Sequence, residues 1–256
     1  MLTKLLIICR YTFVEIYKSK VLINVFLVGL ALLLICYVAY SFTYAVPERI
    51  ALDVGLGMLS LSSVGLAIFF GVGLISKEIE NRTIYMILSR PISRRIFFLG
   101  RILGMIGILI LNISILSTLT ILTYVVLGGV LNKLIFIAII FSIIESIIIL
   151  LIAVLFSLIT NITLSTIYTI VIFISGHALT DTLTNRFATS NVFFNSLLKT
   201  GSYIFPNLSK LNLKDYVLYN QMLPIPTLAW MFSYGVLYSI FLIVIIVVIF
   251  DRKNLD

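Results

Sequence analysis

Long apolar runs dominate this chain and limit what it can fold into. A helix that spans a bilayer needs about 20 mostly apolar residues. Runs of roughly that length cover residues 21–46, 54–75, 98–127, 134–160, 162–180 and 227–250. Only 11% of the residues are charged, against about 25% in an ordinary soluble domain. The sequence therefore predicts one all-α membrane domain, residues 1–256, with six transmembrane helices.

The distribution of Lys and Arg predicts how the chain is oriented. If the N-terminus is inside, 12 of the 18 Lys and Arg residues lie in inner segments and the other 6 lie in outer segments. Cytoplasmic loops of membrane proteins carry such an excess. We therefore expect a protein of the cell (inner) membrane with both termini in the cytoplasm. The same bias explains the net charge of +8, so we expect no nucleic-acid partner.

Two segments outside these runs are more apolar than simple connectors. Within residues 1–20, Lys4 and Arg10 fall on one half of a helix and Phe13 falls on the other half. This pattern favours a helix in the membrane interface, in contact with lipid, over a ragged start of the first span. Residues 181–226 are rich in aromatic residues. Since bare backbone cannot face lipid, we expect an outer re-entrant segment of short helices there, rather than a small soluble cap.

The polar segment KEIENRTIYMILSRPISRR, residues 77–95, separates the second and third apolar runs. As a helix it has one polar face, with Glu78 and Arg82 at a favourable i,i+4 spacing, and one apolar face. Pro91 weakens this helix, because the residue before a proline is pushed out of the α region. Ser93 is then placed to cap the next helix. The segment is a docking element for a partner or an anchor on anionic lipid, and the residues alone favour neither.

Basic residues follow directly after this cap. Arg94 and Arg95 lie in the first turn of the expected next helix. Cations at a helix N-terminus oppose the helix dipole by a few tenths of a kcal/mol. We therefore expect a lipid phosphate or an acidic partner surface to contact them.

A longer motif runs through the same part of the chain. It consists of Glu78-x-Glu80-x-x-Thr83, then Leu88-Ser89-x-Pro91-x-Ser93-Arg94, then Gly100-Arg101. This pattern resembles ATP-binding-cassette permeases of the type-2 exporter family, and most closely the subgroup that includes the nitrous-oxide-reductase maturation permease. The resemblance is close over residues 77–104 and loose elsewhere, although FPNLSKLNLKD (205–215) is also similar. Many relatives carry Gly where this chain has Arg82.

The resemblance implies that membrane transport and ATP hydrolysis belong to separate subunits. In that family, the segment between the second and third spans (here 76–97) holds a cytoplasmic coupling helix that seats in a groove of a separate nucleotide-binding ATPase subunit. The residues implied for this docking surface are Glu78, Glu80, Arg82, Thr83, Tyr85, Ser89, Pro91, Ser93 and Arg94. The family also implies a second permease copy, as a homodimer, with two ATPase subunits.

The chain itself lacks the phosphate-binding loop G-x-x-x-x-G-K-[ST]. We therefore expect no enzymatic activity and no cofactor in this chain, with ATP and Mg bound by the ATPase partner. The function we expect is that of a permease subunit of an ATP-driven exporter with an unidentified substrate. A non-transporting scaffold shares every feature of the docking segment. A secondary transporter would need intramembrane charges in several spans or inverted repeats.

Two ionisable residues lie inside apolar runs. Glu145 and His177 are each 16 residues from Asn161, the centre of a tight turn. An antiparallel hairpin then brings both to one depth, about 24 Å from the turn. Since such residues usually face the bundle interior and have a partner, we expect a direct or water-bridged contact. It would serve as a structural hydrogen bond or as a polar spot on a cargo path. No catalytic or metal site is expected, because no nucleophile or ligand cluster accompanies the pair.

Small residues recur every four positions in two of the runs. They are Ser63, Ala67 and Gly71 in the second run, and Gly100 and Gly104 in the third. Small residues allow helix backbones to approach closely. We expect packing within the chain, while a dimer or translocation face stays open as an alternative use.

Overall fold

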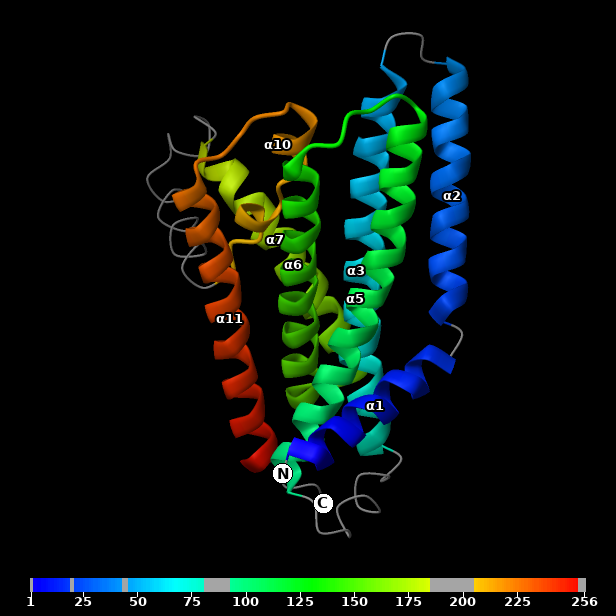
Figure 1. The fold of residues 1–256 in the computed structure, drawn as a ribbon. Helices are drawn as coiled ribbons and strands as arrows, with labels where there is room; N and C mark the ends of the chain where they lie inside the picture. The colour runs from blue at the N-terminus through cyan, green and yellow to red at the C-terminus, as the bar shows by residue number, and fades with distance from the viewer. Residues whose placement is uncertain (1, 19–20, 43–45, 81–92, 185–204, 253–256) are drawn as a thin grey trace.

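The structure is a computed structural model that describes residues 2–18, 21–42, 46–80, 93–184 and 205–252. All regular elements in these residues are helices (Figure 1). They are α1 (Leu2–Lys18), α2 (Val21–Phe42), α3 (Pro47–Glu80), α5 (Arg94–Val126), α6 (Lys133–Ile159), α7 (Ile162–Thr184), the 3₁₀ helix η1 (Ser209–Leu211), α10 (Lys214–Leu218) and α11 (Ile225–Arg252). The expected all-α class is confirmed.

Four of these helices are long and apolar enough to cross a membrane: α3 over Pro47–Gly73, α5, α6 and α11. Two shorter apolar stretches, Val25–Val38 in α2 and Ile162–Ala178 in α7, also lie in the described residues. Many large apolar side chains point outward, among them Phe26 at 68% and Trp230 at 72% exposure. An apolar exterior on long apolar helices indicates an integral membrane protein.

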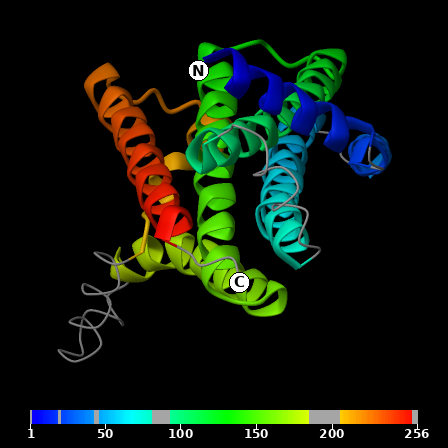
Figure 2. The same cartoon turned by 90° about the horizontal axis from the view of Figure 1, so that it is seen from below.

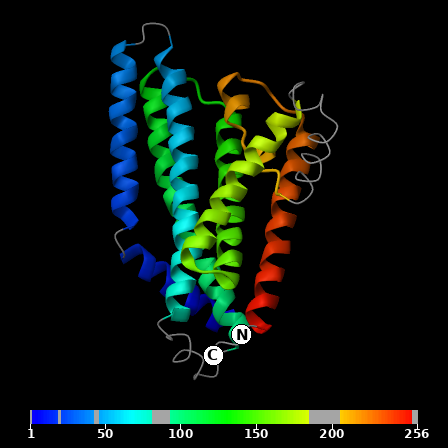
Figure 3. The ribbon, with the colours of Figure 1, turned by 180° about the vertical axis from the view of Figure 1, so that it is seen from behind.

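Helix α6 forms the centre of the bundle. It contacts α3, α5, α7 and α11, and Figure 3 shows α7 covering it from one side. Four consecutive residues of α6, Ile148 to Leu151, have no exposed surface. Because four consecutive helical residues point in all directions around the axis, α6 is enclosed on every side at this level of the bundle.

The two ends of the bundle carry different elements. At one end, here called the α1 end, α1 lies across the bundle against α5 and leads to α2 (Figures 1 and 2). The last turn of α3, the first turn of α5 and the last turn of α11 lie at this same end. The opposite end, here called the α10 end, carries α10 and the connection from α5 to α6.

The small-residue face of α3 packs against α6. The Ser146 hydroxyl donates a hydrogen bond to the Ser63 hydroxyl at 2.9 Å, and Ala67 is fully buried. A Cβ atom on Gly71 would lie 2.5 Å from the Ala153 Cβ, which is closer than real Cβ contacts. This face is therefore used for packing within the chain.

The glycines at the start of α5 accommodate α1. A Cβ atom on Gly100 would lie 2.8 Å from Ile8, and one on Gly104 would lie 2.5 Å from Thr12. Their missing side chains let α1 cross α5 at close range. Helix α1 is separate and ends before α2 begins at Val21. Residues 2–18 are therefore not a ragged start of the first span.

Candidate functional site

The segment with the family-like motif is described only at its borders. Glu78 and Glu80 belong to the last turn of α3, of which the structure describes the backbone alone. The expected docking residues Arg82, Thr83, Tyr85, Ser89 and Pro91 lie outside the described residues. Ser93 stands before α5 in an extended conformation, as a capping residue would, but its side chain makes no capping hydrogen bond. Arg94 is exposed.

Two ion pairs hold the first turns of α5. The Arg95 guanidinium donates to the Asp251 carboxylate of α11, with its Nε at 2.6 Å. One turn and a half later, Arg101 reaches Glu15 of α1 at 2.5 Å. The contact expected for Arg95 was lipid phosphate or a partner surface, and the structure instead provides an acidic residue of the same chain. Sequence reasoning missed Asp251 because it lies 156 positions away.

Inside the bundle, Glu145 and His177 meet. The Nε2 atom of His177 lies 3.2 Å from Oε1 of Glu145, whose side chain is only 3% exposed. The distance is that of an ion pair, but Oε1 accepts no hydrogen bond of regular geometry from the described residues. Oε1 of Glu145 therefore lies close to His177 but is not saturated by it.

The other ring nitrogen of His177 limits how the pair can be protonated. Nδ1 lies 3.1 Å from the Phe173 carbonyl oxygen. Because a carbonyl only accepts, this bond requires a hydrogen on Nδ1. Nε2 and Glu145 then attract each other only if the imidazole or the carboxyl group carries a further proton. Equal spacing from Asn161 predicted the proximity of the two residues, while their role stays a prediction.

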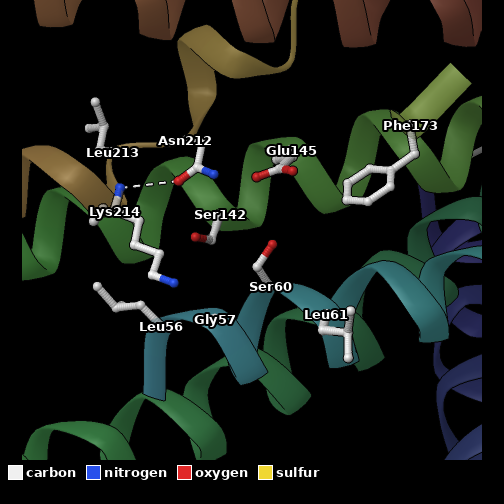
Figure 4. A pocket seen from close by; sticks show the side chains of 11 residues that line it. Leu56, Gly57, Ser60, Leu61, Ser142, Glu145, Phe173, Asn212, Leu213 and Lys214 are labelled. Carbon is white, nitrogen blue, oxygen red and sulfur yellow. Dashed lines mark hydrogen bonds between the residues drawn. The ribbon is translucent and has the colours of Figure 1, made fainter. Parts of the chain in front are cut away.

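Glu145 borders a cavity of about 160 Å³. It lies between α3, α6, α7 and the segment 212–214, and Figure 4 shows the side chains around it. Its polar lining comes from Ser60, Ser142, Glu145, Asn212 and Lys214. Leu56, Leu61, Ala138, Leu213 and Phe173 supply apolar walls.

Lys214 enters this lining through a contact with α3. Its Nζ atom lies 2.6 Å from Asp53, and the two side chains are 32% and 51% exposed. A Cβ atom on Gly57 would come within 3.2 Å of that Nζ, so the glycine leaves room for the ammonium group. The Lys214 backbone N–H donates to the Asn212 side chain at 3.1 Å, which fixes the turn before α10.

The chain before α10 is seated between α7 and α11. The Leu208 N–H donates to the Gly176 carbonyl at 3.1 Å, and the Asn207 N–H donates to the Tyr234 hydroxyl at 2.9 Å. Gly176 has no room for a side chain, since a Cβ atom would lie 2.7 Å from the Pro206 carbonyl oxygen. These two hydrogen bonds hold Asn207 and Leu208 against α7 and α11, and the same segment continues to residues 212–214, which line the cavity.

No group of three or more His, Cys, Asp or Glu residues that could hold a metal ion is present in the described part of the chain. Comparison with models of known protein families gives no match, and no curated protein matches the sequence. The function must therefore be argued from the geometry and from the motif of residues 77–104.

Proposed function

We propose that this chain is the transmembrane permease subunit of an ATP-driven exporter of the type-2 family. In this proposal α2, α3, α5, α6, α7 and α11 are the six spans, and α1 lies in the cytoplasmic membrane interface. Residues 76–97 form the coupling segment, and residues 181–226 form the outer re-entrant segment. A separate ATPase subunit supplies the energy, and a second copy of the chain completes the unit.

The lengths of α3 and α5 support a docking segment that projects from the membrane. The two helices have 34 and 33 residues, so each is about 50 Å long at a rise of about 1.5 Å per residue. A bilayer has a hydrocarbon core of about 30 Å. Both helices border the motif at the α1 end (Figure 1), so their surplus length can carry it beyond the headgroups.

The observation that carries the proposal is the pair of ion contacts on the first turns of α5. The helix that leaves the motif is held to α11 through Arg95 and Asp251 and to α1 through Arg101 and Glu15. A partner that moved residues 77–95 would thereby move three helices together. A segment that served only as a lipid anchor would not need this mechanical connection.

The surface of α1 supports its proposed place in the interface. Ile16 and Thr12 are buried against the bundle, while Leu6 is 57% and Tyr11 is 73% exposed. Arg10 is also exposed. Exposed apolar and basic side chains on one helix suit the boundary between acyl chains and anionic headgroups.

Charge reversal in the motif tests the docking role. In the full-length chain, Glu78→Arg and Glu80→Arg should reduce the recovery of the ATPase subunit with the permease about tenfold, since like charges across an interface cost several kcal/mol. Transport should fall in parallel, while membrane insertion stays unchanged. The measurement is quantitative pull-down in gentle detergent.

The matched control is Glu48→Arg, which changes the same residue type in the first turn of α3, at the α10 end. It should leave ATPase recovery at the wild-type value. Wild-type recovery with both motif variants would contradict docking through these residues. A wild-type chain that retained another protein but no ATPase would favour the scaffold function.

A further inference from the structure

The cavity beside Glu145 contains more hydrogen-bonding capacity than the protein uses. A carboxylate offers about four acceptor positions, and Oε1 of Glu145, 3.2 Å from His177 Nε2, accepts no hydrogen bond of regular geometry from the described residues. The hydroxyl groups of Ser60 and Ser142 line the same cavity. Figure 4 shows the Ser60 hydroxyl directed toward the side where Glu145 lies. Three oxygen-bearing side chains therefore converge on one space.

The charged residues in the cavity lining are Glu145 and Lys214. The Lys214 ammonium and the Asp53 carboxylate are paired at 2.6 Å and balance each other. The carboxylate of Glu145 has the imidazole of His177 on one side, and that pair is attractive only while it holds an additional proton. A bound cation can supply the positive charge in place of this proton, and so lower the cost of an ionised carboxylate inside the membrane.

We propose that this cavity binds a small primary alkylammonium ion. A primary ammonium group has three N–H donors, which match the Glu145 carboxylate and the hydroxyls of Ser60 and Ser142. Hydrogen bonds between an ammonium and a carboxylate are among the strong ones. The alkyl part would lie against Leu56, Leu61, Ala138 and Phe173. A metal cation is a poorer match, because these walls are apolar.

The size of the cavity limits the ligand. A protein cavity of about 150 Å³ holds a molecule as large as benzene, and this one measures about 160 Å³. A ligand of about six non-hydrogen atoms is therefore the upper limit without movement of the walls. Lys214 lines the cavity and is partly exposed, so the ligand would enter from the α10 end.

This binding site is a property of the single chain and does not depend on an ATPase. The test uses the full-length protein in detergent and measures binding of butylammonium by isothermal titration calorimetry. 1-Butanol serves as the neutral probe of equal size, and butyrate as the anionic one. We expect butylammonium to bind at least about tenfold more tightly than either. Equal affinity for butylammonium and butanol would overturn the proposal.

Two variants with opposite expected effects make the test specific. Glu145→Gln should weaken butylammonium binding at least about tenfold, because the counter-charge is removed. Lys214→Gln should strengthen it, because a neighbouring positive charge is lost and Asp53 becomes unbalanced. Weaker binding in Lys214→Gln, or unchanged binding in Glu145→Gln, would overturn the proposal.

A third variant allows the proposal to be tested even if Glu145→Gln does not fold. Ser142→Ala removes one acceptor and should weaken butylammonium binding several-fold while leaving butanol binding unchanged. Ser114→Ala is the matched control, since Ser114 is exposed on α5 and its hydroxyl bonds only the carbonyl of Ile110. An equal loss of affinity in both serine variants would contradict the site.

Discussion

The two ends of the bundle hold their charged residues differently. At the α1 end, Arg95–Asp251 and Arg101–Glu15 join three helices through side chains of which at least one is well exposed. The polar cavity toward the α10 end reaches the middle of α6, where Glu145 is buried beside His177. Exposed ion pairs contribute little to folding, because water and salt screen them. A buried carboxylate is costly unless it is paired or neutral.

The contrast suggests different tasks for the two ends. Weak, screened contacts can still define how α1, α5 and α11 are aligned with one another. The buried contact between Glu145 and His177 joins α6 to α7 at the edge of a space that a ligand can fill. The predictions below test this difference, beginning with the question of which end faces outward.

Labelling from outside the cell should separate the two ends completely. Lys214→Cys should react with an impermeant maleimide in intact cells, since the Lys214 side chain is 32% exposed at the α10 end. Arg94→Cys, at the α1 end, should react only after lysis. Lys199→Cys, outside the described residues, should react like Lys214→Cys.

Both native cysteines must first be replaced by serine. Burial raises the pKa of the Cys9 thiol, which lowers the thiolate fraction available for reaction, but replacement removes this background altogether. Labelling of Arg94→Cys in intact cells, with Lys214→Cys protected until lysis, would reverse the proposed orientation.

Removing one partner of the buried pair should cause the largest loss of stability. His177→Leu leaves Glu145 without its neighbour and should lower the free energy of unfolding by about 3 kcal/mol. In a Glu145→Gln background the same change should cost less, because no charge is left unpaired. Thermal unfolding in detergent measures both, and a double-mutant cycle gives their coupling. A coupling energy of zero would show that proximity has no energetic consequence.

Close backbone contacts at the two ends should respond to an added methyl group. Gly176→Ala would place a Cβ 2.7 Å from a backbone oxygen of the seated segment, and Gly104→Ala would place one 2.5 Å from Thr12 of α1. Both should lose about 1–3 kcal/mol, with the larger loss for Gly176, since α1 lies on the surface and can shift. Gly73→Ala is the control: nothing lies within 4 Å of that position, so no loss is expected. A loss for Gly73→Ala comparable to the other two would contradict the packing explanation.

The sequence predicted the apolar parts of the helices better than their ends. Helix α3 begins at Pro47 and ends at Glu80, whereas its apolar run covers residues 54–75. Hydropathy detects only the part of a helix that suits lipid, and helical hydrogen bonding continues into polar residues beyond it. Likewise α5 begins at Arg94, before the apolar run that starts at residue 98.

The candidate site was predictable only where it depends on local spacing. Glu145 and His177 flank one tight turn, so equal spacing was enough to bring them together. Asp53 and Lys214 are far apart in the sequence, and only the insertion of residues 205–218 between helices joins them. The glycines at positions 57 and 176 were a weak signal of this insertion, because a glycine inside a helix often marks a close approach.

The smallest effect is expected for the ion pair between Arg101, which is 11% exposed, and the more exposed Glu15 at the α1 end. Glu15→Gln removes the partner of Arg101, but the Glu15 side chain is 58% exposed, so the free energy of unfolding should fall by less than about 1 kcal/mol. Salt should abolish even this difference, because the Debye length, over which salt screens a charge, is about 3 Å at about 1 M salt. Thermal unfolding of Glu15→Gln and the wild-type chain at low and high salt measures it. A loss above about 2 kcal/mol that persists at high salt would remove the contrast between the ends, because α1 would then be fixed as firmly as the buried pair.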